Sequence, residues 1–203
     1  QSFIITNNGA ATLEVQISHG SVVADVDGNI YETVEIGSQL WMKENLKVTH
    51  YNDGDEIIES TESYIYFDTN NVEPPYVAAY GLHPSLNDPD TYGILYNSYV
   101  VLEGEICPEG WHVPSESEFS MLINYLDDNP GGKLKEVGYE HWWSPNTGAT
   151  NESGFTALPG GAHHEWCNNS WCAIGSDSYF WTSTQGNDGQ DDSNAATVTL
   201  VVN

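Results

Sequence analysis

The chain has 203 residues, of which 30 are acidic and 4 are basic, and its formal net charge is −26. A nucleic-acid-binding protein needs a basic surface that neutralises phosphates, so this composition excludes that class. It also disfavours an anionic membrane surface as a partner, and no apolar run approaches the roughly 18 residues of a membrane span. The 39% of hydrophobic residues suffices for a packed core, so we expect a folded domain suited to cations or a salty exterior.

Residues 1–24 are predicted to form an N-terminal β extension. Two short apolar runs, Ser2–Thr6 and Ala11–Ile17, flank the hairpin signal Asn7-Asn8-Gly9. Because a two-stranded ribbon is marginal in water, we expect it to pack on the main domain or on another chain. Apolar edges at both ends of the chain supply candidate assembly residues, which are Phe3, Ile4, Ile5, Leu13, Val15, Ile17, Val198, Leu200 and Val202.

A hairpin is predicted after this extension. The turn-forming sequence Asp25–Asn29 precedes strands predicted at Ile30–Ile36 and Gln39–Met42. Its Asp-x-Asp-Gly-Asn pattern is similar to the start of an EF-hand loop. The position that should carry the last calcium ligand is Ile36, however, so we interpret the run as a turn.

The middle of the chain is predicted to be rich in loops, with one strong helix. Residues 50–92 carry many Pro, Asp and Asn, and an aromatic strand is predicted at Tyr92–Asn97, continuing to 100–101. The helix, at about 114–128, has Ser115 as its N-cap and Glu118 completing a capping box. His112, just before it, is expected to be a hydrogen-bonded structural residue. Residues 130–132 should end the helix, and a second short helix or turn is expected at 133–136.

Strands predicted at Tyr179–Ser183 and Thr197–Val202 give an α+β pattern with more strand than helix. The acidic turn between them places Asp188, Asp191 and Asp192 as candidate Ca²⁺ ligands, with a solvated loop as the alternative. Calcium is therefore a candidate rather than an assigned cofactor. Asn151 and Asn168 begin Asn-x-Ser sequons and are candidate glycosylation sites.

Cysteine usage points to an oxidising compartment. Cys167 and Cys172 are separated by four residues, which suits a disulfide across a tight loop, while a metal site with the nearby histidines is the alternative. Cys107 is then either a buried thiol or the partner of a cysteine outside this chain. A local disulfide in an aromatic-rich, lysine-poor chain favours an extracellular location.

Six sequence blocks in order resemble one known family, the Fibrobacter succinogenes major paralogous domain, which is common in secreted proteins of Bacteroidetes-like bacteria. The resemblance extends from about 25 to 187, and its blocks lie at 27–46, 92–97, 107–115, 131–135, 151–161 and 180–184. It implies a C-type-lectin-like domain over 25–203, with a fold also similar to formylglycine-generating enzymes. The chain departs from the family pattern at Ala162–His164, where an arginine is usual, and lacks the family's terminal cysteine.

The tryptophans divide into two groups when the family blocks are considered. Trp41, Trp111 and Trp181 lie in those blocks and are expected in the core. The remaining four lie in polar segments and are candidate ligand-binding residues, namely Trp142, Trp143, Trp166 and Trp171. No spacing of carboxylates, histidines or cysteines singles out a catalytic set, so no enzymatic activity is predicted.

The sequence leaves two functions open for an extracellular surface protein. The first, slightly favoured, is a self-assembling subunit of a fibre or surface layer, in which terminal β-strands join copies of the chain. The second is a lectin-like adhesion module that binds a glycan or a surface protein through its Trp-rich loops. The fold alone does not decide between them, because it hosts many functions.

Overall fold

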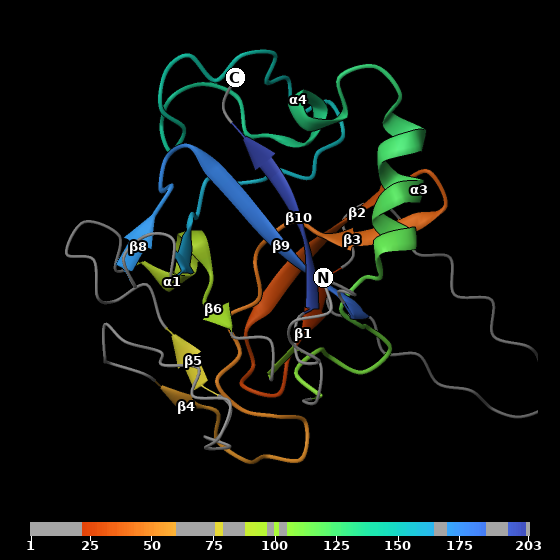
Figure 1. The fold of residues 1–203 in the computed structure, drawn as a ribbon. Coiled ribbons are helices and arrows are strands. Elements are labelled where there is room, and N and C mark those ends of the chain that lie inside the picture. Colours follow the sequence, from red (N-terminus) through yellow and green to blue (C-terminus); the bar gives the residue numbers. More distant parts are fainter. Residues whose placement is uncertain are drawn as a thin grey trace, which may run out of the picture.

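The computed structural model describes residues 22–59, 76–78, 88–96, 100–101, 105–164, 170–185 and 195–201. These residues form a mixed architecture of short strands and three named helices, which confirms the predicted α+β class (Figure 1). The strands are β1 (Val22–Ala24), β2 (Ile30–Ile36), β3 (Gln39–Met42), β4 (Ile58–Glu59), β5 (Tyr76–Ala78), β6 (Leu95–Tyr96), β7 (Ala162–His164), β8 (Ser170–Cys172), β9 (Asp177–Gln185) and β10 (Ala195–Val201). The helices are α1 (Pro89–Tyr92), α3 (Glu116–Leu126) and α4 (Pro130–Leu134).

The described strands are arranged in four small sheets. Two have three strands, in the orders β1-β2-β3 and β4-β5-β6, and two are antiparallel pairs, β7 with β8 and β9 with β10. Strands β2 and β3 lie at the predicted residues, joined through Gly37 with a φ of 66°. The extension predicted for residues 1–24 ends in β1, which pairs antiparallel with β2.

Strand β2 connects two hydrophobic cores because it buries different faces along its length. Successive side chains of a strand point to opposite faces. Tyr31 and Thr33 are buried on one face, and the Tyr31 hydroxyl accepts a hydrogen bond from the backbone N–H of Lys47, the residue before Val48 of the second core. The Val48 carbonyl in turn accepts a hydrogen bond from Tyr96 at 2.8 Å. Further along, Ile36 is buried in the first core, which lies against α3. The strand therefore fixes how the two cores are placed.

Helix α3 confirms the predicted helix and its N-terminal signal. Ser115 is the N-cap, and both hydrogen bonds of the capping box with Glu118 are present. The free carboxylate oxygen of Glu118 lies 2.8 Å from Nε2 of His112, so this histidine is hydrogen-bonded as expected. Phe119, Leu122 and Leu126 are buried in the first core, as their helical spacing predicts.

The C-terminal strand differs from the free edge that the sequence suggested. Strand β10 pairs antiparallel with β9 along almost its whole length, and Val198 and Leu200 stand opposite Phe180 and Ser178. One edge of the strand is thus occupied within the chain. Of the two partners, Ser178 is 2% exposed, so this ladder belongs to the body of the domain. Val202 lies outside the described residues.

One local prediction was wrong, and the bounds of another are shifted. The strand predicted from Tyr92 through 101 is interrupted, because Asp88 caps α1 and Gly93, with a φ of 73°, ends it, leaving only β6 as strand. Residues 100–101 are helical. Helix α3 ends at Leu126, before residues 130–132, as predicted. The second short helix predicted at 133–136 is α4, which begins three residues earlier because Pro130 occupies its first turn, where the missing N–H costs nothing.

All four lysines are held by contacts within the domain. Lys43 and Lys47 form ion pairs with Glu32 and Asp90 at 2.6 and 2.5 Å. The ammonium of Lys133 donates to the carbonyl of Leu126 at 2.7 Å, at the end of α3. Lys135 is buried and lies 5.2 Å from the ring centroid of Trp142. Among the helices within the described ranges, none has the length and apolarity to cross a membrane.

Candidate binding surface

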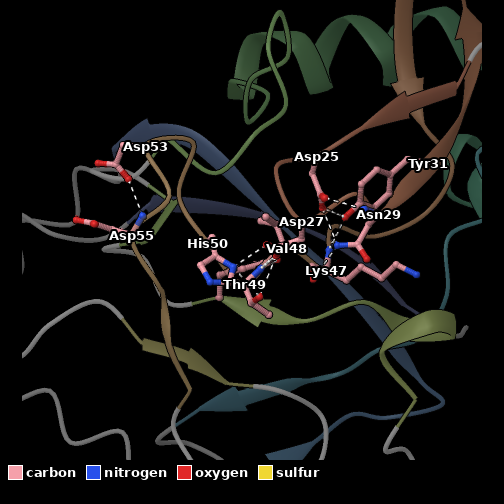
Figure 2. A network of polar contacts seen from close by, with 11 residues as sticks. Asp25, Asp27, Asn29, Tyr31, Lys47, Val48, Thr49, His50, Asp53 and Asp55 are labelled. Carbon is pink, nitrogen blue, oxygen red and sulfur yellow. Dashed lines mark hydrogen bonds and ion pairs between the residues drawn. The ribbon is translucent and has the colours of Figure 1, made fainter.

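The EF-hand-like run is a structural turn between β1 and β2 (Figure 2). Asp25 is 8% exposed, and its carboxylate accepts hydrogen bonds from the Asn29 backbone at 2.9 Å, the Asn29 amide at 2.8 Å and the Tyr31 hydroxyl at 2.6 Å. The same hydroxyl accepts from the backbone N–H of Lys47 at 3.0 Å. Burial, together with Asp25, raises the pKa of Tyr31 far above its usual value. The phenol therefore stays protonated and links the turn to the second core.

The second carboxylate of the turn, Asp27, attaches it to the following loop (Figure 2). Its Oδ2 accepts from the backbone N–H of Thr49 at 2.5 Å and from the Thr49 hydroxyl at 2.9 Å, and Oδ1 lies 2.6 Å from Nδ1 of His50. Desolvation raises the pKa of Asp27, but these hydrogen bonds outweigh it and hold the pKa below its usual value.

The acidic side chains near this turn do not converge on an ion position. Asp53 accepts from the backbone N–H of Asp55 at 3.0 Å, and Figure 2 shows both residues pointing away from Asp25 and Asp27. No group of three or more potential metal ligands is found among the residues that the structure describes. The turn interpretation of residues 25–29 is confirmed. The candidate Ca²⁺ ligands Asp188, Asp191 and Asp192 lie outside the described ranges, so calcium there stays a prediction.

A compact loop at residues 136–146, called here the 136–146 loop, is fixed from inside by two buried residues. Trp142 is 1% exposed, and its Nε1 donates to the carbonyl of Ala157 at 3.0 Å. Asn146 is also buried and closes the loop, because its amide donates to the carbonyls of Glu136 and Gly138, both at 2.9 Å. A loop whose ends meet and whose own side chains fill it is held rigidly.

The same loop presents apolar side chains to solvent. Val137 is 57% exposed, Tyr139 67% and Trp143 65%. Exposed large hydrophobic residues are ordinary when they are scattered, but a rigid loop that carries three of them within seven residues is typical of a recognition surface. We refer to these three side chains as the loop surface.

Trp143 is held in place by the turn between β8 and β9. Its backbone N–H donates to the carbonyl of Gly175 at 2.7 Å. A Cβ atom built on Gly175 would overlap the indole of Trp143, so the glycine backbone lies directly against the ring. One side of the indole is thereby covered while most of the side chain remains exposed. The result is a flat aromatic surface with a fixed orientation.

A carboxylate–histidine pair lies at the base of the same loop. Nδ1 of His141 is 2.9 Å from both carboxylate oxygens of Glu136. The His141 ring also makes an edge contact with Tyr92 of α1, with ring centroids 5.5 Å apart. Burial, then Glu136, Asp88 and Glu140, raise the pKa of Tyr92. The surroundings of the loop are therefore acidic.

A small cavity lies beside the β3 end and the 155–158 segment. It has a volume of about 210 Å³ and lies between residues 42–45, Thr91 and residues 155–158. Ligand pockets usually enclose about 300–1,000 Å³. Two of its polar residues are already engaged, since Lys43 pairs with Glu32 and the Asn45 amide donates to the Tyr92 carbonyl at 2.9 Å. This cavity is a weaker candidate than the loop surface.

The four tryptophans proposed from the sequence do not form one exposed set. The prediction for Trp142 was wrong, because its indole is part of the interior and anchors the loop. Trp143 is exposed, as predicted. Trp171 lies in β8, the strand that leads into the turn beneath Trp143, and nothing further is described of its side chain. Trp166 lies outside the described residues.

Sequence reasoning missed Val137, Tyr139 and Gly175. The first two lie beside Gly138 in a polar segment that precedes the tryptophan pair, and this combination of glycine and aromatic residues was the available signal. No local signal marks Gly175, because its partner is distant in the sequence.

The remaining predicted site residues have mixed outcomes. The Asn151 amide is used internally, since it accepts from the Thr156 N–H and donates to the Thr156 hydroxyl, both at 2.9 Å, so glycosylation there would disturb an existing contact. Cys107 is a free thiol. Cys167, Asn168 and the assembly residues Phe3, Ile4, Ile5, Leu13, Val15 and Ile17 lie outside the described ranges, so the Cys167–Cys172 disulfide stays a prediction.

Comparison with protein families matches residues 34–201 to the model of the Fibrobacter succinogenes major domain. This match covers most of the chain and runs from the middle of β2 to the end of β10. The chain belongs to the Fibrobacter succinogenes major domain family. The family range extends past the resemblance noted in the sequence and includes β10, which agrees with the pairing of that strand with β9.

No curated protein and no solved structure matches the chain. The 136–146 loop and the turn at Gly175 both lie within the matched residues of the Fibrobacter succinogenes major domain. The loop surface is thus carried by the domain itself.

Proposed function

We propose that this Fibrobacter succinogenes major domain is a non-enzymatic extracellular recognition module that binds a glycan through Trp143. The observation that carries the proposal is the fixed, 65%-exposed indole of Trp143 against Gly175. A flat aromatic ring offers the apolar C–H face of a pyranose a large contact area at a small cost in side-chain entropy. Because the ring is already held in place, little ordering is needed on binding.

A glycan fits this surface better than a large protein partner does. Stable protein interfaces bury about 800 Å² on each partner around a cluster of apolar anchors. The loop surface offers one fixed ring, with Tyr139 and Val137 beside it in the sequence and carboxylates around it. A single sugar unit stacked on Trp143 matches that arrangement.

The extracellular location and the C-type-lectin-like arrangement belong to the same proposal. The predicted Cys167–Cys172 disulfide supports an oxidising compartment, and the low lysine content and strong negative charge suit a salty exterior. The segment from Cys107 to Pro114 that leads into α3, together with the Phe-Trp-Thr sequence inside β9, supports the fold relationship.

The test is a glycan array probed with the full chain and with Trp143→Ala. We expect the wild-type chain to bind a subset of glycans and the variant to lose at least tenfold in affinity, as for removal of a central aromatic anchor. Tyr125→Ala is the matched control, because Tyr125 is an aromatic residue of α3 that is 64% exposed. Equal loss in both variants, or no glycan bound by the wild type, would refute the proposal.

Self-assembly is the second candidate, and exposed apolar residues of the β1–β2 hairpin favour it. Val22 is 61% exposed and Ile30 57%, and the register places Ala24 opposite Ile30 and Val22 opposite Glu32, so these side chains share one face. Among the described strands, β1 pairs only with β2 and leaves one edge open. In this second candidate the open edge of β1 is covered by another copy of the chain. The apolar segments predicted at Ser2–Thr6 and Ala11–Ile17 of that copy would supply the added strand.

Electron microscopy of negatively stained wild-type protein and of Ile30→Asp tests this second candidate. Filaments or sheets in the wild type that disappear in Ile30→Asp are the expected result. Met121→Asp is the control, because Met121 is 53% exposed on α3 and the substitution adds the same charge. Dispersed wild-type particles would remove self-assembly from consideration.

A further inference from the structure

The charged side chains near the loop surface are mostly carboxylates. Glu136 and Glu140 are part of the 136–146 loop, and Asp88 caps α1, whose Tyr92 contacts His141. The Glu136 carboxylate lies 2.9 Å from Nδ1 of His141, whose ring packs edge-on against Tyr92 at the end of the helix that Asp88 caps, and Glu140 precedes His141 in the chain. Glu140 is three residues from Trp143, which places the two Cα atoms within about 11 Å of each other.

No lysine in the chain offsets these carboxylates at the loop surface. There is no arginine, and each of the four lysines is already engaged, by Glu32, by Asp90 of α1, by the Leu126 carbonyl or by the face of Trp142. Lys135 is the nearest in sequence, but it is 3% exposed and lies beneath the loop, against the buried Trp142. His141 is already paired with Glu136. An anionic group brought to Trp143 would therefore meet carboxylates without a free ammonium.

We infer that the loop surface selects pyranose ligands without negative charge and rejects those that carry carboxylates or sulfates. This inference rests on the proposed function and adds the class of ligand. Trp143 supplies contact area that every pyranose can use, so the aromatic ring alone does not discriminate. Discrimination comes from like-charge repulsion by Glu136, Glu140 and Asp88, added to the field of a chain with a net charge of −26.

The test compares pairs of oligosaccharides that have the same linkage and length but differ in charge. In one pair the units are glucose and glucuronic acid, and in the other they are galactose and galacturonic acid. Binding to the full chain is measured by calorimetry at low and at high ionic strength. We expect the neutral member of a pair to bind about tenfold or more tightly at low salt. Salt should narrow that difference, because the Debye length falls from about 30 Å at 0.01 M to about 3 Å at 1 M.

A charge variant separates this inference from the proposed function. Glu140→Gln should strengthen binding of the acidic oligomer about twofold at low salt and leave the neutral one unchanged, since one unit charge at 8–10 Å in water contributes about that much. Glu35→Gln, on the exposed side of β2, is the control. The inference would be overturned, and the proposed function kept, if acidic oligomers bound as tightly as neutral ones or more tightly and this binding were lost in Trp143→Ala. No binding of any oligomer would overturn the proposed function and the inference with it.

Discussion

The backbone N–H of Trp143 donates to the carbonyl oxygen of Gly175 at 2.7 Å, and the indole of Trp143 lies on that glycine. The two residues come from segments 32 positions apart, the 136–146 loop and the turn between β8 and β9. The exposed ring is thus oriented by a neighbouring turn as well as by its own loop. This relationship can be tested without changing the tryptophan.

Gly175→Ala should displace the Trp143 ring while the fold is retained. Gly175 has a φ of 78°, so alanine costs roughly 1–2 kcal/mol in backbone conformation, and its Cβ would overlap the indole. We expect glycan binding to fall about as far as in Trp143→Ala. Gly28→Ala is the control, because Gly28 has a φ of 82° and open space where its Cβ would lie. Similar binding by both glycine variants would contradict the role given to Gly175.

The two adjacent tryptophans should differ sharply in their effect on stability. Trp142 is buried and hydrogen-bonded, so Trp142→Ala should lower the free energy of unfolding by about 3–5 kcal/mol. Trp143→Ala should change it by no more than about 1 kcal/mol, because its ring is largely exposed. Urea denaturation followed by circular dichroism measures both values. A large loss in Trp143→Ala would mean that the ring is part of the core.

Glu118 should contribute to stability at neutral pH and not in strong acid. Hydrogen bonds from Ser115, and then His112, hold the pKa of Glu118 below its usual value of 4.5. A carboxyl group with a lowered pKa in the folded state stabilises the fold above its unfolded pKa, and that contribution disappears as the pH falls through the folded pKa.

Glu118→Gln should therefore cost roughly 1 kcal/mol near pH 7, as for loss of a capping interaction, and almost nothing near pH 2. Chemical denaturation at the two pH values measures the difference. The exposed Glu152 offers a comparison, and Glu152→Gln should leave the stability unchanged at both. A cost for Glu118→Gln that is independent of pH would show that the charge of the carboxylate is irrelevant.

The three cysteines should fall into two classes in a labelling experiment. Burial raises the pKa of the Cys107 thiol to about 11, so the folded protein should react slowly with an alkylating reagent near pH 8. Denaturant without reductant should then expose one reactive thiol, and denaturant with reductant three, if Cys167 and Cys172 form the predicted disulfide. Mass spectrometry counts the added groups. Three labels without reductant would exclude the disulfide.

Local signals predicted the elements whose interactions are local. The capping box of Ser115 and Glu118 and the turn at Gly37 between β2 and β3 depend on residues a few positions apart, and the structure has both. The continuous strand expected from Tyr92 onward was wrong, because Asp88, four residues earlier, caps a short helix that competes for the same residues. Strand propensity alone does not detect such competition.

The site was only half predictable for a related reason. Trp142 and Trp143 are equivalent in composition and neighbourhood, and which one enters the core depends on the Ala157 carbonyl and on Gly175, both more than ten residues away. The sequence could therefore indicate the candidate segment but not which of its two rings is exposed. The charge of the site was predictable, because it follows from composition.

All four lysines lie in hydrogen-bonded parts of the fold, and this position affects how the protein is cleaved by proteases. Trypsin cleaves after lysine or arginine, and this chain has only Lys43, Lys47, Lys133 and Lys135. The backbone N–H of each is hydrogen-bonded, to Glu32, the Tyr31 hydroxyl, Asn129 and Gly131 respectively. Residues 60–75, 79–87 and 186–194 contain no tryptic site at all. Tryptic digestion therefore requires opening of the folded core, so its rate reports the stability of the domain.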